Sequence, residues 1–294
     1  MKEGTNIPSF VHMGESFMDI HYLGTAAVEG WPAVFCECET CTKARKIGGK
    51  NIRTRSQVLI DSTLLVDLPP DTYYHAIREQ IKLSKIVSLV VTHSHQDHFY
   101  PIELIMRGEP YAHIASESSM LTVYGNDKVH SFFNDAMKQD DSRNLKDRIC
   151  FQEIHAFEPF STKDGYDILP LLANHAKDEK CLIYIIKKDG KTILYGNDTG
   201  WFPEATWAHI ANIHFNLVSL DCTCMGEKDG TYHMGLPDNI AVRKRLEEER
   251  CIDEHTQFVI THFSHNGKLM HDELVKIAQP QGFIAAYDGM TIRI

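Results

Sequence analysis

Residues 89–99 read LVVTHSHQDHF, an apolar run that ends in four side chains able to bind a metal ion. The run before His93 is rich in β-branched residues and predicts a buried strand. Side chains alternate along an extended chain, so His93 and His95 point the same way and can face one ion. Asp97 and His98 follow in the turn, where they can reach a second ion. The stretch therefore predicts a metal site where a strand ends.

The spacing HxHxDH after an apolar strand resembles the signature of the metallo-β-lactamase-fold hydrolases. The later ligands of that family have counterparts here in the same order: His175 in LPLLANHAKDEKC, Asp198 in TILYGNDTGW and His262 in FVITHFSHN. Asp67 in TLLVDLPPD matches the aspartate that supports the site from behind the ligands. Five separated motifs agree, so the resemblance extends over most of the chain, from about residue 20 to 290.

The resemblance implies a dinuclear site. One ion would take His93, His95 and His175; the other would take Asp97, His98 and His262; and Asp198 would bridge the two. Imidazole and carboxylate ligands suit zinc or manganese, with iron as a further candidate. Two ions about 3.5–4 Å apart can lower the pKa of a shared water towards ~7 and direct the resulting hydroxide at an electrophile. We therefore expect a metal-dependent hydrolase, with Asp97 and Asp198 in its catalytic set.

A second cluster lies upstream, where Cys36, Cys38 and Cys41 place three thiols within six residues. Without a secretory signal, such a cluster is better interpreted as a metal site than as disulfides. Three thiolates need one more ligand to complete a tetrahedral structural zinc. The C-x-C-x2-C spacing resembles the PhnP-like phosphodiesterase branch, where the fourth ligand is a histidine three residues after the last active-site histidine. That position is His265 here.

His233, in TYHMGLPDN, precedes an expected amphipathic helix. It resembles the histidine that PhnP-like and tRNase Z-like phosphodiesterases place over their metals without using it as a ligand. The resemblance implies that His233 protonates the leaving alkoxide, which is a poor leaving group unaided.

These features favour a phosphodiesterase acting on small phosphodiesters, with cyclic ones among the candidates. One alternative is a thioester, lactone or β-lactam hydrolase, since such enzymes share HxHxDH and the bridging aspartate. Another is a cofactor-biosynthesis protein resembling PqqB, which shares the cysteine cluster but lacks a complete ligand set. A tRNA 3′-processing nuclease shares the catalytic residues but carries a basic arm that is not apparent here.

Composition fits an acidic enzyme with a small anionic substrate. The net charge of −10 argues against a nucleic-acid polymer as partner. We find no run of about 18 apolar residues and no signal-peptide pattern, and we expect a cytoplasmic protein with no membrane contact. Eight cysteines fit that reducing compartment. A homodimer is compatible with the sequence but not indicated by any motif.

The 294 residues are expected to form one domain, with an N-terminal extension at 1–17 and a polar surface excursion at 125–165. The fold class is α/β, a four-layer αββα sandwich of two mixed sheets with helices outside and the site at one edge. Strands are expected at 17–23, 56–61, 63–67, 86–92, 111–115, 149–155, 167–173, 181–187, 191–196, 216–221, 257–261 and 290–294. Helices are expected near 40–47, 70–82, 98–107, 117–123, 127–138, 203–212, 237–249 and 270–277.

Overall fold

Two seven-stranded mixed sheets form the centre of the molecule. The structure, a computed structural model, describes residues 16–115 and 120–294. The first sheet has the order β14-β1-β2-β3-β4-β5-β6, and the second has the order β13-β12-β11-β10-β9-β8-β7. The strands are β1 Asp19–Gly24, β2 Gln57–Ile60, β3 Leu64–Val66, β4 Ser88–Val90, β5 Leu121–Gly125, β6 Ile149–Glu153, β7 Phe160–Ser161, β8 Asp167–Leu172, β9 Leu182–Lys188, β10 Lys191–Gly196, β11 Leu217–Asp221, β12 Gln257–Thr261, β13 Phe283–Ala285 and β14 Met290–Arg293.

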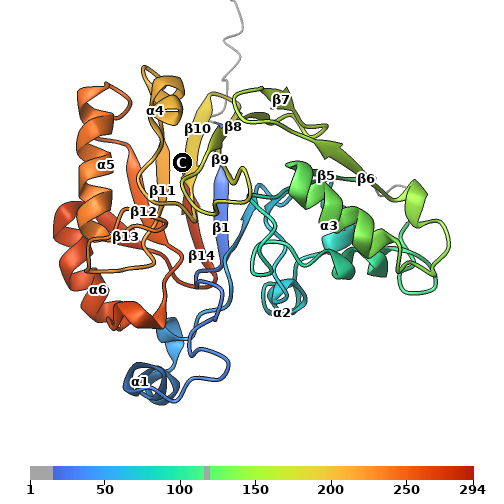
Figure 1. Cartoon of the computed structure of the whole chain (residues 1–294), viewed down its shortest axis with the longest axis horizontal. Helices are drawn as coiled ribbons and strands as arrows, with labels where there is room; N and C mark the ends of the chain where they lie inside the picture. Colours follow the sequence, from blue (N-terminus) through green and yellow to red (C-terminus); the bar gives the residue numbers. More distant parts are fainter. Residues whose placement is uncertain (1–15, 116–119) are drawn as a thin grey trace, which may run out of the picture.

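The helices lie outside the two sheets (Figure 1). Helices α4, α5 and α6 lie on the side of the second sheet, and α2 and α3 lie on the side of the first. The α-helices are α1 Glu39–Ile47, α2 Thr72–Arg78, α3 Asp127–Met137, α4 Glu204–Ile210, α5 Leu236–Glu248 and α6 His271–Ala278. Short 3-10 helices occupy Gly49–Asn51, Leu83–Lys85, Pro101–Arg107, Leu145–Asp147, His265–Gly267 and Gln279–Gln281. This is the expected four-layer αββα sandwich.

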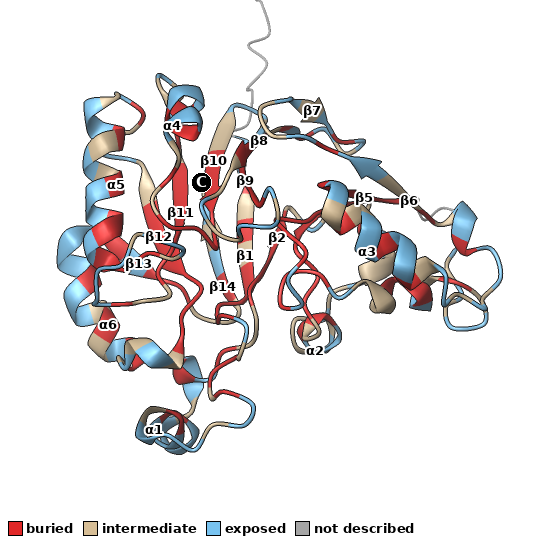
Figure 2. Cartoon of the chain, in the orientation of Figure 1, coloured by how far each residue is buried: buried red, intermediate tan, exposed pale blue. Residues whose placement is uncertain are grey.

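The strands are apolar on both faces because each sheet is buried on both sides, by the other sheet on one face and by helices on the other. In β9, Leu182, Tyr184 and Ile186 enter the core between the sheets, whereas Ile183 and Ile185 enter the core beneath the helices. Alternate residues of β2, β3, β4 and β10 divide in the same way between an inner and an outer core. Continuous apolar runs are typical of strands buried on both faces. Figure 2 shows these strands as buried and the outer faces of the helices as exposed.

Each sheet joins antiparallel pairs to parallel pairs, which fixes the position of the site. Strands β3, β4, β5 and β6 are parallel in the first sheet, as are β10, β11, β12 and β13 in the second. The carboxyl ends of parallel strands meet at one edge of a sheet, and the loops that leave them form the ligand site in such folds.

The polar surface excursion at 125–165 is a wrong prediction. Helix α3 and strand β6 lie within it, and β6 pairs with β5 in parallel. Val129, Phe133 and Ile149 are buried in the core of the first sheet. The polar stretches that suggested an excursion occupy the turns, while apolar residues at helical and strand spacing between them pack inwards.

Several individual elements also differ from the expectation. Residues 111–115 form no strand, and Leu121–Gly125 is a strand rather than part of a helix. Residues 117–119 of that expected helix lie outside the described residues, as do 1–15 of the N-terminal extension. The helix expected at 98–107 is a 3-10 helix over Pro101–Arg107. Two short strands, β7 and β13, were not expected, because two or three residues carry too little periodicity to be recognised.

No helix in the described part of the chain has both the length and the apolar character that crossing a bilayer requires.

Candidate metal centre

The candidate ligands converge because the strands that carry them end at the same level. Asp221 at the end of β11 pairs with Thr261 of β12, so His262 follows immediately beyond that level. Gly196 of β10 pairs with Leu220, which brings Asp198 to the same edge. In the other sheet Val66 pairs with Val90, and the next residues lead to Asp67 and His93. The two sheets therefore supply side chains to a single cluster from opposite sides.

Three of these strand-end residues adopt a left-handed backbone. Asp67, Asp198 and His262 have φ values of 66°, 56° and 63°. Residues other than glycine rarely adopt this conformation, and it costs roughly 1–3 kcal/mol where it occurs. At each position the chain leaves the strand abruptly and turns the side chain into the cluster. Strain of this kind persists where the surrounding packing imposes it, typically at functional sites.

The first candidate ligand group is His93, His95, His175 and Asp198, whose ligand atoms all lie within 4.8 Å of one another. His95 Nδ1 and His175 Nε2 are 3.2 Å apart, and His93 Nε2 lies 3.3 Å from Asp198 Oδ2. Burial is the main reason that the pKa values of His93 and His175 are lowered. Both rings are therefore held neutral, which is the state that binds a metal.

The second candidate group is Asp97, His98, Asp198 and His262. All four side chains are buried. His98 Nε2 and His262 Nε2 are 3.3 Å apart, and His98 Nε2 lies 3.0 Å from Asp198 Oδ2. Asp198 belongs to both groups, as the predicted bridge requires. The structure thus brings together all seven residues predicted as ligands of the dinuclear site.

Asp67 lies behind His98, as expected from the sequence. Its Oδ2 lies 2.7 Å from His98 Nδ1, and its Oδ1 accepts hydrogen bonds from the backbone N–H and hydroxyl of Thr92. This contact orients the ring and leaves His98 Nε2 facing the cluster. Burial lowers the pKa of His98, but the carboxylates of Asp97 and Asp67 outweigh it and raise that pKa well above its usual value.

The residues fit a pair of metal ions. His93 Nε2 and Asp97 Oδ1 are buried and form no hydrogen bond within the described part of the chain. Such groups are costly unless another partner satisfies them. Ring nitrogens and carboxylate oxygens that converge in this way are the donor set preferred by zinc, manganese and iron.

Two residues of the site were missed by the sequence analysis. Glu179 accepts from the backbone N–H and the hydroxyl of Ser94, at 2.9 and 2.6 Å, and thereby holds the turn between His93 and His95. Asp221 is fully buried, and its Oδ1 accepts from the backbone N–H groups of Thr223 and Met234. Asp221 ends the apolar run NLVSLD, but no motif around it marks it as part of the site.

His233 lies over the cluster, on the loop that joins β11 to α5. Its Nδ1 lies 3.0 Å from Asp221 Oδ2 and 3.1 Å from Asp198 Oδ1. Burial lowers its pKa, but the two carboxylates more than offset this and raise the pKa to about 11. Asp198, Asp221, His233 and His262 also form a group that could hold an ion. The non-ligand role of His233 therefore stays a prediction.

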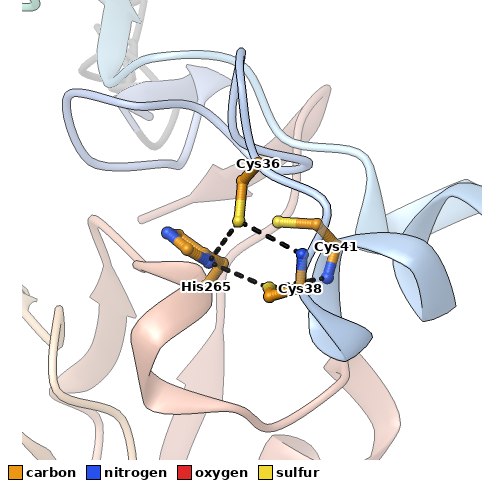
Figure 3. A group of neighbouring side chains, drawn as sticks. All are labelled: Cys36, Cys38, Cys41 and His265. Atoms are coloured by element: carbon orange, nitrogen blue, oxygen red, sulfur yellow. Dashed lines mark hydrogen bonds between the residues drawn. The ribbon is translucent and has the colours of Figure 1, made fainter.

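Cys36, Cys38, Cys41 and His265 form the separate cluster that the sequence predicts. Figure 3 shows the three thiols and the imidazole directed at one another. Cys36 and Cys38 lie just before α1, Cys41 lies in its first turn, and His265 lies on the loop after β12. His265 Nδ1 lies 3.4 Å from Cys38 Sγ and 3.8 Å from Cys36 Sγ. The backbone N–H of Cys41 is the main reason that the pKa of Cys38 is lowered to about 6. Three thiols and one imidazole fit a structural zinc.

A cavity of about 710 Å³ opens onto the dinuclear ligands. It is lined by His95, Asp97, His175, Asp198, His233 and His262, together with Ala27, Val28, Glu29, Gln96, Thr223, Cys224, Glu227, Ser264, Asn266 and Gly267. The candidate ligands and the candidate acid His233 therefore line the same cavity, which offers space for a substrate.

A family model described as a β-lactamase superfamily domain matches residues 58–256. The chain belongs to this superfamily. The matched segment contains Asp67, the HSHQDH turn, His175, Asp198 and His233. No curated protein sequence matches the chain.

Several solved structures share the fold. A diphosphatase of the PhnP family is 21% identical, with a TM-score of 0.73, and the match covers 95% of this chain and 98% of that one. Zn²⁺-bound PqqB from Methylobacterium extorquens is 19% identical, with a TM-score of 0.73 and coverage of 93% and 99%. The short form of human tRNase Z is 18% identical, with a TM-score of 0.63 and coverage of 93% and 98%. The metallo-β-lactamase fold predicted from the sequence is confirmed.

Proposed function

We propose that the protein is a dinuclear metallohydrolase that cleaves small phosphodiesters. The observation that carries the proposal is the position of His233, which rests on Asp221 in the same cavity as the seven dinuclear ligands. A hydrolase of acyl substrates with good leaving groups has no need of a proton donor there. An alkoxide leaving from phosphorus does need one.

Each residue of the site would have a distinct role in this reaction. Two divalent ions held by these ligands would lower the pKa of a shared water and stabilise the charge that develops on the phosphoryl oxygens. Asp221 accepts the Nδ1–H of His233, which fixes the tautomer and directs Nε2 away from the carboxylate. His233 can then donate a proton from Nε2 to the departing oxygen. Asp67 holds His98 in place through Nδ1.

The acyl-hydrolase alternative remains the main rival, since the ligand set serves either reaction. The PqqB-like alternative is less favoured, because all seven ligand positions are filled here and converge. A nuclease acting on tRNA is less favoured because the chain carries a net charge of −10.

We also propose a reducing, cytoplasmic location, which is supported by eight free cysteines.

A substrate panel tests the proposal. The protein, loaded with zinc or with manganese, is assayed with bis-p-nitrophenyl phosphate, a 2′,3′-cyclic nucleotide, an S-acyl thioester and a γ-lactone. We expect turnover of the two phosphodiesters and little or none of the acyl substrates. Asp198→Asn, which removes the bridging charge, is the control and should lose the activity. Turnover of the thioester or lactone alone would reject the phosphodiesterase.

A further inference from the structure

The charges around the cavity differ from those expected of a site for a polyanionic substrate. Besides the ligand carboxylates, Glu29 and Glu227 line it. No lysine or arginine lines it among the residues that the structure describes. Sites that bind phosphate groups in addition to the one attacked normally provide arginine or lysine for them.

Glu29 is held firmly in the cavity wall. Its Oε1 accepts a hydrogen bond of 2.5 Å from the hydroxyl of Ser264 and lies 3.7 Å from His265 Nε2. These contacts fix the carboxylate next to the loop that carries His262. Its side chain keeps 25% of its surface exposed, so its charge reaches the cavity.

Glu227 comes from a different segment, the loop between β11 and α5 that also carries His233. Its backbone N–H donates to the carbonyl of Cys224, and its side chain is exposed. Glu29 and Glu227 therefore line the cavity from separate parts of the chain.

Four cations lie on segments next to the lining, but none of them is part of it. Arg55 Nε donates to the carbonyl of Val28, and its guanidinium is paired with Asp71 at 3.1 Å. Lys177 Nζ lies 5.8 Å from the centre of the Tyr232 ring. Lys228 and Lys268 are chain neighbours of the lining residues Glu227 and Gly267.

The loaded site has no positive charge to spare for a second anionic group on the substrate. Two divalent ions would bring four positive charges, and Asp67, Asp97, Asp198 and the attacking hydroxide would offset all four. A protonated His233 and Asp221 offset each other. Any further anionic group on the substrate would meet Glu29 and Glu227 without a cation to balance it.

We propose that the cavity selects phosphodiester monoanions whose ester arms are neutral or cationic, and that Glu29 and Glu227 exclude substrates carrying a second phosphate. The inference rests on the proposed phosphodiesterase function and adds the class of substrate. Hydroxide forms the new P–O bond, the P–O bond to the leaving arm breaks, and that oxygen takes the proton from His233. The products are a phosphate monoester and a neutral alcohol.

A matched pair of substrates tests the proposal on the metal-loaded protein. Thymidine 5′-(p-nitrophenyl phosphate) and the same ester carrying a 3′-phosphate differ in one distal phosphate group and share a leaving group. We expect kcat/KM to favour the first by at least about 10-fold. The ratio should fall by about 3-fold or more in Glu227→Gln and further in Glu29→Gln/Glu227→Gln. Glu248→Gln, an exposed carboxylate on α5, is the control and should keep the wild-type ratio.

Equilibrium binding gives a second readout that does not depend on turnover. Calorimetry on the loaded protein should show tighter binding of thymidine 5′-monophosphate than of thymidine 3′,5′-bisphosphate, with the difference reduced in the Glu227→Gln variant. Equal kcat/KM values for the two esters in the wild type, or a ratio unchanged by Glu227→Gln, would overturn the charge selection while leaving the phosphodiesterase intact. Absence of turnover of both esters, with the thioester or lactone cleaved instead, would reject the proposed function and this inference with it.

Discussion

At the scale of single residues, the site depends on carboxylates that hold imidazoles by one nitrogen and free the other. Asp67 does this for His98, and Asp221 does it for His233. The carboxylate fixes the orientation and tautomer of the ring, which is the usual arrangement behind metal ligands and general acids. His98 thereby faces the candidate ions and His233 faces the substrate space.

Replacing His233 tests its role as proton donor. We expect His233→Ala to keep its metal content and to lose about 10²–10⁴-fold in turnover of a cyclic nucleotide, whose alkoxide must be protonated as it leaves. Hydrolysis of a p-nitrophenyl phosphodiester should fall far less, since p-nitrophenolate leaves as the anion. His255→Ala, an exposed histidine elsewhere, serves as the control. Loss of an ion from the variant would make His233 a ligand, and equal losses on both substrates would indicate a role in binding.

Asp221 and His233 should act as a unit. Asp221→Asn should reduce turnover of the cyclic nucleotide selectively, because the imidazolium loses its charged partner. Since the two residues serve one step, the double variant should be little worse than His233→Ala alone, as a double-mutant cycle would show. Fully additive losses would mean that Asp221 acts elsewhere, for example through the loop that its Oδ1 holds.

At the scale of elements, the cysteine cluster joins two segments far apart in the sequence. Residues 36–41 span the start of α1, and His265 lies on the loop that also carries His262. The backbone strengthens the same connection, because Phe263 N–H donates to the carbonyl of Thr25 and Ala27 N–H donates to that of Phe263. A zinc ion here would anchor the segment before α1 to a loop of the dinuclear site.

Cys38→Ser tests the structural zinc. We expect loss of one zinc and a melting temperature lower by about 5 °C or more, because a structural ion contributes directly to folding free energy. Catalysis per folded molecule should change less than stability. Cys150→Ser, whose thiol lies outside the cluster and donates to the hydroxyl of Thr122, is the matched control. Unchanged melting temperature and zinc content in Cys38→Ser would reject the structural site.

The sequence predicted the elements that carry ligands better than those that do not. Strands such as β4, β10 and β12 are apolar runs that end in histidine or aspartate, so periodicity and chemistry agree. Strand β5, which carries no ligand, was expected to be helical in part, although Leu121–Gly125 is rich in β-branched and aromatic residues. Asp221 was missed because one aspartate at a strand end has no distinctive spacing. Only the register between β11 and β12 places it beside His262.

At the scale of the whole molecule, the two sheets place a cluster of carboxylates and imidazoles at one edge. Within this cluster, neighbouring side chains shift one another's pKa values. Burial opposes charge on His98 and His262, but neighbouring carboxylates, Asp97 for His98 and Asp198 for His262, raise the pKa of both rings. In the metal-free protein both rings therefore keep a proton to higher pH than a free imidazole, and they must lose it to bind an ion.

Metal binding should consequently release protons. Calorimetric titration of the metal-free protein with zinc at pH 7, in buffers of different ionisation enthalpy, should show at least one proton released as the dinuclear site fills. The sign follows from the raised pKa values, since protons compete with the ions and affinity falls as the pH is lowered. Binding heats independent of the buffer, or affinity that rises on acidification, would contradict the assignment of these rings as ligands.

The most direct test of the whole account is the metal content of protein purified without chelator. Elemental analysis should find about three ions per chain, two in the dinuclear site and one on the cysteines. A crystal of the same protein should show two of them about 3.5–4 Å apart with Asp198 between them, and the third among Cys36, Cys38, Cys41 and His265. One ion or none per chain, or ions bound away from these residues, would contradict the account.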